Sequence, residues 1–215
     1  MSLLSFLRRL DTKRRNRKKR PELEAFQRAV ESLEPGDVAI DCGANVGIYT
    51  VRMAKSGATV HAFEPNLAAY KALLENTKDF SNVKTYHAAV TTEPGPVKLF
   101  LHKWADEDPL EWSTGSSLVE KKKNVRSDKF MVVEGVPLAE FIKGLGERVR
   151  ILKMDIEGAE VGILNRLLDE GLHESIDHVF VEVHDRKIKE LVKPTEELRA
   201  RLKQLGVTNF RLDWR

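Results

Sequence analysis

The chain has 215 residues, which is enough for one α/β domain with a buried sheet and hardly enough for two. Hydrophobic residues make up 41% of it and charged residues 32%, and no apolar stretch approaches the length of a transmembrane helix, so that class is excluded. The one cysteine, Cys42, excludes an internal disulfide and fits a cytoplasmic location.

The formal net charge of +3 hides a strongly basic first segment. Residues 1–20 hold nine of the 36 Lys and Arg side chains but only one of the 33 Asp and Glu side chains. We expect a flexible basic arm here, followed by a single domain over residues 21–215. An apolar stripe at helical spacing precedes the basic run: Leu3, Phe6, Leu7 and Leu10. Contact with an anionic membrane surface, binding of nucleic acid, and docking on the domain or a partner subunit all remain open.

Beyond the arm, apolar periodicity predicts strands that alternate with helices. The expected helices are 21–33, 46–55, 67–78, 138–143, 159–169 and 194–205, and the expected strands are 38–40, 59–63, 83–90, 97–102, 130–136, 150–156, 178–184 and 207–214. This alternation favours an α/β fold with a doubly wound, mainly parallel sheet. Residues 103–129 are too long for a plain connection and are rich in charge, Ser and Gly, so we expect a lid over the ligand site.

The turn after the first strand has the pattern Asp41-x-Gly43-x-x-x-Gly47. Glycine permits a tight turn and a close approach of the backbone to a ligand. The second strand ends at Glu64, where a carboxylate meets the two ribose hydroxyls of a nucleotide. An anion at Asp41 would repel the pyrophosphate of NAD but suits the sulfonium and ammonium groups of S-adenosylmethionine (SAM). We therefore predict SAM as the cofactor.

Acidic side chains gather after the strand 150–156. Asp155, Glu157 and Glu160 come in quick succession there, although acidic residues also favour a helix N-terminus, which is the simpler explanation of Glu160. In the strand 178–184, alternation places Glu182 and His184 on one face. Since carboxyl ends of parallel strands share an edge, we expect Asp155 and His184 to face the mouth of the cofactor site.

Two mechanisms for methylating a hydroxyl remain open from these residues. His184 is the first choice of base, because its unperturbed pKa lies near neutral pH. Alternatively, Asp155, Glu182 and His184 hold a divalent metal ion that acidifies the acceptor hydroxyl.

Five blocks of the sequence together resemble the FkbM-type methyltransferases. They are Asp-Cys-Gly-Ala-Asn-Val-Gly-Ile-Tyr-Thr from 41, Phe-Glu-Pro-Asn from 63, Ser-Thr-Gly-Ser-Ser-Leu from 113, Lys-Met-Asp-Ile-Glu-Gly-Ala-Glu from 153, and Glu-Val-His from 182. The resemblance implies a Rossmann-like class I SAM-dependent fold. It also implies O-methylation of a hydroxyl on a sugar, a glycan or another natural product.

The same resemblance implies roles for individual residues. The methionine part of SAM would lie on Asp41, Gly43, Asn45 and Gly47, the ribose on Glu64, the adenine edge on Ala88 and Ala89, the acceptor beside Asp155, Glu157 and His184, and the lid on Ser116 and Ser117. Two other functions stay open. One is a SAM-dependent RNA or protein methyltransferase anchored by the basic arm, and the other is a SAM-binding module without catalysis.

Overall fold

The computed structural model describes residues 21–213. The arm expected over residues 1–20 lies outside the described residues, as does Trp214, the last residue of the edge strand expected at 207–214. None of the helices in the described part of the chain has the length and apolar character needed to cross a membrane.

Six strands form the main sheet in the order β3-β2-β1-β7-β8-β9, and every strand pairing within it is parallel. In chain order these strands are β1 (Val38–Cys42), β2 (Thr59–Phe63), β3 (Val83–Tyr86), β7 (Val149–Met154), β8 (Ile176–Val181) and β9 (Phe210–Arg211). The predicted α/β fold with a mainly parallel sheet is confirmed. All six carboxyl ends therefore lie at one edge, where ligands of such sheets bind.

Helices cover both faces of the main sheet. They are α2 (Pro21–Glu31), α3 (Ile48–Ala54), α4 (Leu67–Thr77), α5 (Leu138–Leu145), α6 (Glu160–Asp169) and α7 (Val192–Gln204). Side chains alternate along each strand, so Ile40 packs in the core cluster with α5, α6 and α7, while Ala39 packs in the cluster with α2 and α3. Burial on both faces explains why these strands are apolar throughout.

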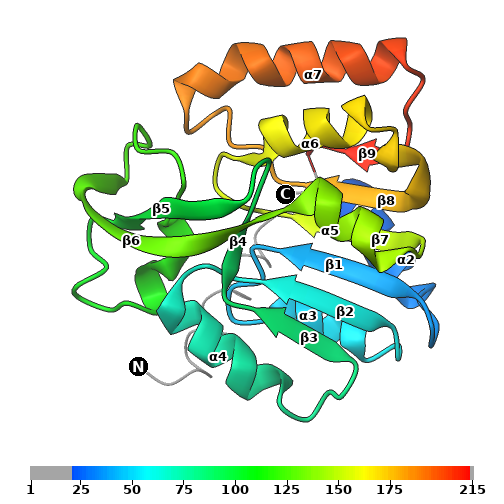
Figure 1. The fold of residues 1–215 in the computed structure, drawn as a ribbon, viewed down its shortest axis with the longest axis horizontal. Coiled ribbons are helices and arrows are strands. Elements are labelled where there is room, and N and C mark those ends of the chain that lie inside the picture. The colour runs from blue at the N-terminus through cyan, green and yellow to red at the C-terminus, as the bar shows by residue number, and fades with distance from the viewer. Residues whose placement is uncertain (1–20, 214–215) are drawn as a thin grey trace.

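A second sheet of three strands, absent from the prediction, stands beside the carboxyl edge of the first (Figure 1). It consists of β4 (Ala88–Thr91), β5 (Gly95–His102) and β6 (Val125–Pro137), with β6 between the other two. The strand expected over 83–90 is therefore wrong in extent, because the chain leaves the main sheet at His87 and continues as β4. No glycine or proline marks this break, so the apolar pattern runs through it.

Two other elements near the site have bounds that differ from the expected ones. Strand β6 begins at Val125, so the last residues of the expected lid 103–129 belong to the second sheet, and Glu111–Gly115 form a short 3-10 helix. Strand β8 ends at Val181, before Glu182 and His184. Strand alternation therefore does not account for the placement of these two side chains, although they do lie on the same side, with Oε1 of Glu182 3.9 Å from Nε2 of His184.

Candidate active site

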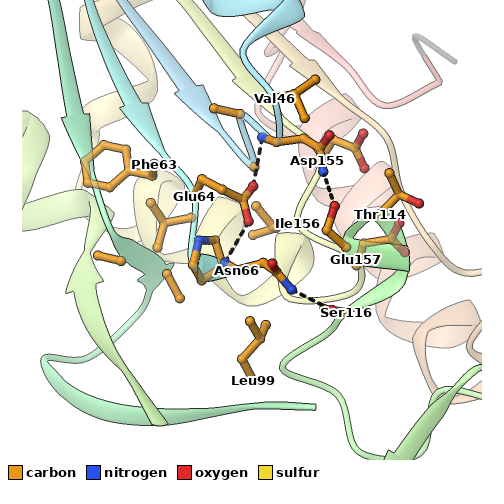
Figure 2. Close-up of a pocket in the computed structure, with 18 of the residues that line it drawn as sticks. Val46, Phe63, Glu64, Asn66, Leu99, Thr114, Ser116, Asp155, Ile156 and Glu157 are labelled. Carbon is orange, nitrogen blue, oxygen red and sulfur yellow. Dashed lines mark hydrogen bonds between the residues drawn. The ribbon is translucent and has the colours of Figure 1, made fainter. Parts of the chain in front are cut away.

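A cavity opens at the carboxyl edge of the main sheet, between that edge and the second sheet (Figure 2). Loops after β1, β2 and β7 supply its polar wall, and β4 and β5 supply apolar side chains from the other side. Residues from the segment 113–118 also line it. The cavity thus gathers residues from both sheets and from the expected lid.

The glycine turn is fixed by close contacts with the neighbouring loop. Gly43 has φ +76°, and a Cβ there would lie 2.0 Å from the carbonyl oxygen of Asp155. No other residue type fits this position. Its N–H donates to the carbonyl of Phe63 at 3.0 Å, so the turn links the ends of β2 and β7. Gly47 does not line the cavity. Glycine is required there for packing, because an added Cβ would lie 2.8 Å from the side chain of Leu73.

Glu64 faces the cavity from the end of β2 and is held by two backbone amides. The N–H of Asn45 donates to Oε2 at 2.8 Å and the N–H of Asn66 to Oε1 at 2.7 Å (Figure 2). Only 6% of Glu64 is exposed. Burial raises the pKa of its carboxyl to about 7, against the opposing effect of both amides. Glu64 is therefore a carboxylate whose charge a ligand with donor hydroxyls would stabilise.

Asp41 lies beneath the cavity and does not line it. It is fully buried, its Oδ2 accepts from Thr50 Oγ1 at 2.7 Å, and its Oδ1 lies 2.8 Å from Nζ of Lys153. Lys153 is 1% exposed and also donates to the carbonyl of Gly43 at 2.7 Å. The argument that Asp41 offers a free negative charge to a ligand therefore needs correction, because Lys153 balances that charge.

Three carboxylates from the segment after β7, those of Asp155, Glu157 and Glu160, gather around the buried imidazole of His184, which follows β8. Glu160 is fully buried, and its Oε1 lies 2.8 Å from Nδ1 of His184. The same oxygen accepts the N–H groups of Ile156 and Gly158 at 3.2 and 3.1 Å. Glu160 therefore fixes both the imidazole and the loop that carries Asp155 and Glu157. This role went unpredicted, since an acidic residue in a first helical turn has a commoner explanation.

The other imidazole nitrogen, Nε2, faces the remaining carboxylates. It lies 3.1 Å from Oε2 of Glu157, 3.7 Å from Oδ1 of Asp155 and 3.9 Å from Oε1 of Glu182. Burial alone would lower the pKa of His184, but its contacts with Glu157 and Glu160 raise it to about 10. Both ring nitrogens therefore face carboxylates, and the assignment of His184 as the general base stays a prediction.

Glu157 occupies a backbone conformation that few residues other than glycine adopt. Its φ is +61°, and that of Asn45 is +51°. Both residues line the cavity, and strained backbone of this kind concentrates at functional sites. Despite burial, the close contact with His184 and its charge, together with the charge of Lys122, lower the pKa of Glu157 to about 2. It is a carboxylate at every physiological pH.

The expected lid contacts the cavity through its serines. Ser113 Oγ accepts from the side chain of Asn45 at 3.0 Å, and Ser116 Oγ accepts from that of Asn66 at 3.4 Å (Figure 2). Ser117 is buried and does not line the cavity, but its Oγ donates to the carbonyl of Glu157 at 2.6 Å. Lys122, which is 3% exposed, donates to the carbonyl of Gly115 and to Oε2 of Glu157 at 2.5 Å.

The structure brings most of the predicted site residues to one cavity. Eight of them line it: Gly43, Asn45, Glu64, Ala88, Ala89, Ser116, Asp155 and Glu157. Five others do not line it: Asp41, Gly47, Ser117, Glu182 and His184. Lys122, Lys153 and Glu160 were missed. A lysine inside an apolar strand is a signal that could have identified Lys153, whereas Lys122 lies in a run of three lysines that resembles a solvated loop.

Residues 41–207 match the model of the methyltransferase FkbM domain. Methyltransferase 1 of Beauveria bassiana is 27% identical over 165 residues, which cover 69% of this chain and 65% of that protein. The hexuronic acid methyltransferase AglP of Haloferax volcanii is 25% identical over 166 residues, covering 77% of this chain and 63% of AglP. The chain thus spans slightly less than two thirds of the length of these two relatives.

A shorter match joins the chain to 31-O-demethyl-FK506 methyltransferase FkbM of Streptomyces tacrolimicus, with 46% identity over 46 residues, which cover 20% of this chain and 18% of that protein. Among solved structures, SMU.1697c of Streptococcus mutans, a putative methyltransferase in complex with SAH, has a TM-score of 0.47 and 13% identity. That comparison covers 89% of this chain and 84% of the other.

Proposed function

Because this chain belongs to the methyltransferase family defined by the FkbM domain, we propose that it transfers the methyl group of SAM to a hydroxyl group of a sugar, a glycan or another natural product. The observation that carries this proposal is the cavity itself. It has a ribose-type carboxylate, Glu64, at one end and two acidic side chains, Asp155 and Glu157, at the other. Figure 2 displays these groups on either side of Ile156.

The side chains around the cavity fit SAM. Glu64 offers a buried carboxylate to paired ribose hydroxyls, whose hydrogen bonds would offset the burial that raises its pKa. Ala88, Ala89 and Leu99 line the part of the wall formed by the second sheet, where small and apolar side chains leave space for a flat adenine ring. When bound, SAM supplies a methyl group on a positively charged sulfur.

The names of two relatives support a hydroxyl acceptor. One is a hexuronic acid methyltransferase, and the other acts on 31-O-demethyl-FK506 by its name. In such a transfer the acceptor oxygen forms a bond to the methyl carbon while the sulfur–methyl bond breaks. The electron pair of that bond stays on sulfur, and the hydroxyl proton leaves to water. The chain's part is to align the oxygen with the methyl carbon, and we assign this alignment to Asp155 and Glu157.

We also propose that the segment from Lys103 to Asn124 acts as the lid. Ser113 and Ser116 hydrogen-bond to Asn45 and Asn66, the two residues whose amides hold Glu64. Closure of this segment would therefore order the ribose site and exclude water from it.

The first test is titration calorimetry with SAM, S-adenosylhomocysteine and NAD. We expect both adenosyl ligands to bind and NAD to fail, since the glycine turn lacks the pyrophosphate pattern. A mass-spectrometric screen of sugars, glycans and RNA with SAM then identifies the acceptor. Methylation of RNA alone would overturn the proposed acceptor class, and failure of both adenosyl ligands to bind would overturn the cofactor.

Affinity for SAM is expected to depend on pH through Glu64. Its pKa of about 7 in the free protein means that the carboxyl is mostly protonated below that pH. Ribose hydroxyls donate to the charged form, so SAM should bind more tightly as pH rises through 7 and should release a proton on binding. Between pH 8 and pH 6 we expect affinity to fall about tenfold.

The control for this prediction is Glu64→Gln, which cannot titrate. The variant should bind SAM more weakly at pH 8 and should lose the part of the pH dependence that Glu64 causes. Calorimetry in buffers with different ionisation enthalpies measures proton release directly. Equal pH dependence in the two proteins would contradict the assignment.

A further inference from the structure

The proposed reaction needs a group that helps the acceptor hydroxyl lose its proton. The candidates in the site are the acidic side chains and His184. Both ring nitrogens of His184 already face carboxylates, Nδ1 at 2.8 Å from Glu160 and Nε2 at 3.1 Å from Glu157. A divalent cation supplies the same help differently, because it lowers the pKa of a hydroxyl that contacts it.

We propose that Asp155, Glu157 and Nε2 of His184 bind one divalent metal ion of the Mn²⁺ type next to the acceptor. Their ligand atoms all lie within 4.8 Å of one another. Nε2 lies 3.1 Å from Oε2 of Glu157 and 3.7 Å from Oδ1 of Asp155. Ligand atoms that surround one first-row metal ion at about 2.1 Å are roughly 3–4 Å apart, so the spacing suits a shared ion.

A second observation points to a cation independently of the acidic residues. The side chain of His184 is fully buried, and among residues 21–213 its Nε2 has no hydrogen-bond partner of acceptable geometry. Buried polar atoms rarely remain so. The opposite nitrogen, Nδ1, is held by Glu160 at 2.8 Å. A carboxylate on one imidazole nitrogen and a metal on the other is a recurrent arrangement, in which the carboxylate fixes the tautomer and orients the ring.

The charges around His184 also favour a divalent cation. Four carboxylates lie about its imidazole, those of Asp155, Glu157, Glu160 and Glu182. Two ammonium groups, from Lys122 and Lys187, pair with Glu157 and Glu182. A metal ion on Nε2 would release the proton of that nitrogen to water. With the imidazole then neutral, the cluster keeps two negative charges, which one divalent ion balances. Two carboxylates with one imidazole suit Mn²⁺ better than Mg²⁺, since Mg²⁺ prefers oxygen ligands alone.

This ligand set differs from the one expected from the sequence in one residue. Glu157 takes the place of Glu182, whose nearer oxygen is 3.9 Å from Nε2 and which lies outside the group of mutually close ligand atoms. The inference rests on the proposed function for its role in catalysis, but metal binding can be measured alone.

The test is a titration of the metal-stripped full chain with Mn²⁺, followed by the loss of the electron paramagnetic resonance signal of the free ion. We expect one bound Mn²⁺ per chain. Asp155→Asn and Glu157→Gln should each weaken binding by about 100-fold or more, since each removes a direct ligand. Glu160→Gln, which changes only the partner of Nδ1, should weaken it about 10- to 100-fold. This graded loss identifies Glu160 as a positioning residue.

Two variants serve as matched controls. Glu182→Gln makes the same chemical change in a carboxylate of the cluster that is not a ligand, and it should lower the affinity less than about fivefold through charge alone. Glu190→Gln removes an exposed charge elsewhere and should leave the affinity unchanged. Circular dichroism and SAM calorimetry on each variant establish that it is folded.

Three outcomes separate this inference from the proposed function. If the wild-type chain binds SAM but takes up no Mn²⁺ up to about 1 mM, the weak end of protein cation sites, the metal site is overturned and the methyltransferase proposal stands. If Glu182→Gln abolishes Mn²⁺ binding and Glu157→Gln does not, the assigned ligand set is overturned. If Mn²⁺ binds as expected but SAM does not, the metal site stands and the proposed function fails.

Discussion

Replacing Glu64 with alanine is expected to weaken binding of SAM by about 100-fold at pH 8. The substitution removes the carboxylate proposed to accept both ribose hydroxyls, and hydrogen bonds to a charged group are worth about 1.5–3 kcal/mol each. A loss of roughly 3 kcal/mol corresponds to about a 100-fold change in the dissociation constant. Titration calorimetry measures it, and pH 8 keeps the wild-type carboxyl ionised.

Two further variants distinguish lost ribose binding from a disturbed loop. Glu64 also accepts the N–H groups of Asn45 and Asn66, so its loss could disturb the loops. Glu64→Gln retains one amide-accepting oxygen and the side-chain volume, and it should fall between alanine and the wild type. Glu93→Ala removes an exposed carboxylate outside the cavity and should bind SAM normally. Unchanged affinity in Glu64→Ala would exclude Glu64 from the ribose site.

The second large effect is on stability. Lys153→Met is expected to lower the free energy of unfolding by about 3–5 kcal/mol, because it leaves the charge of Asp41 buried without its counterion. Both residues are at most 1% exposed, and Nζ lies 2.8 Å from Oδ1. Methionine has a similar length, so lost packing contributes little. Urea unfolding followed by circular dichroism gives the value.

The double variant Asp41→Asn with Lys153→Met tests whether the unpaired charge of Asp41 causes the loss of stability. Without either charge the core holds no unpaired ion, so we expect the double variant to be more stable than Lys153→Met alone. Lys193→Met is the matched control, since it breaks an exposed pair with Glu197 and should change stability by less than about 0.5 kcal/mol. A loss below about 1 kcal/mol in Lys153→Met would mean that Asp41 is not charged in the folded protein.

Most residues that line the cavity could be predicted, because the evidence for them is local. Gly43 and Glu64 each follow directly on an apolar strand, and parallel strands bring their carboxyl ends together. The position of a residue relative to a strand end is therefore enough to place it at the cavity. That part of the segment 103–129 lies beside the cavity could be predicted for a similar reason, since a long polar segment between strands lies at the surface.

The roles of the acidic residues could not be predicted, because they depend on the direction in which each side chain points. Glu160 and Glu157 are three residues apart and look alike in the sequence. Only the folded chain shows that Glu157 lines the cavity while Glu160 points into the interior toward His184. The state of His184 has the same origin, since its pKa of about 10 depends on carboxylates from another loop.

By itself, then, the sequence determined the parallel α/β architecture, the glycine turn and the position of Glu64, because strand periodicity and turn chemistry are properties of neighbouring residues. The tertiary structure alone decided three other features: the break at His87 that creates a second sheet, the pairing of Asp41 with Lys153, and the arrangement of carboxylates around His184. Each of these depends on contacts between segments far apart in the chain. In the last two, a buried charged group is stabilised only by a partner of opposite charge that the fold brings beside it.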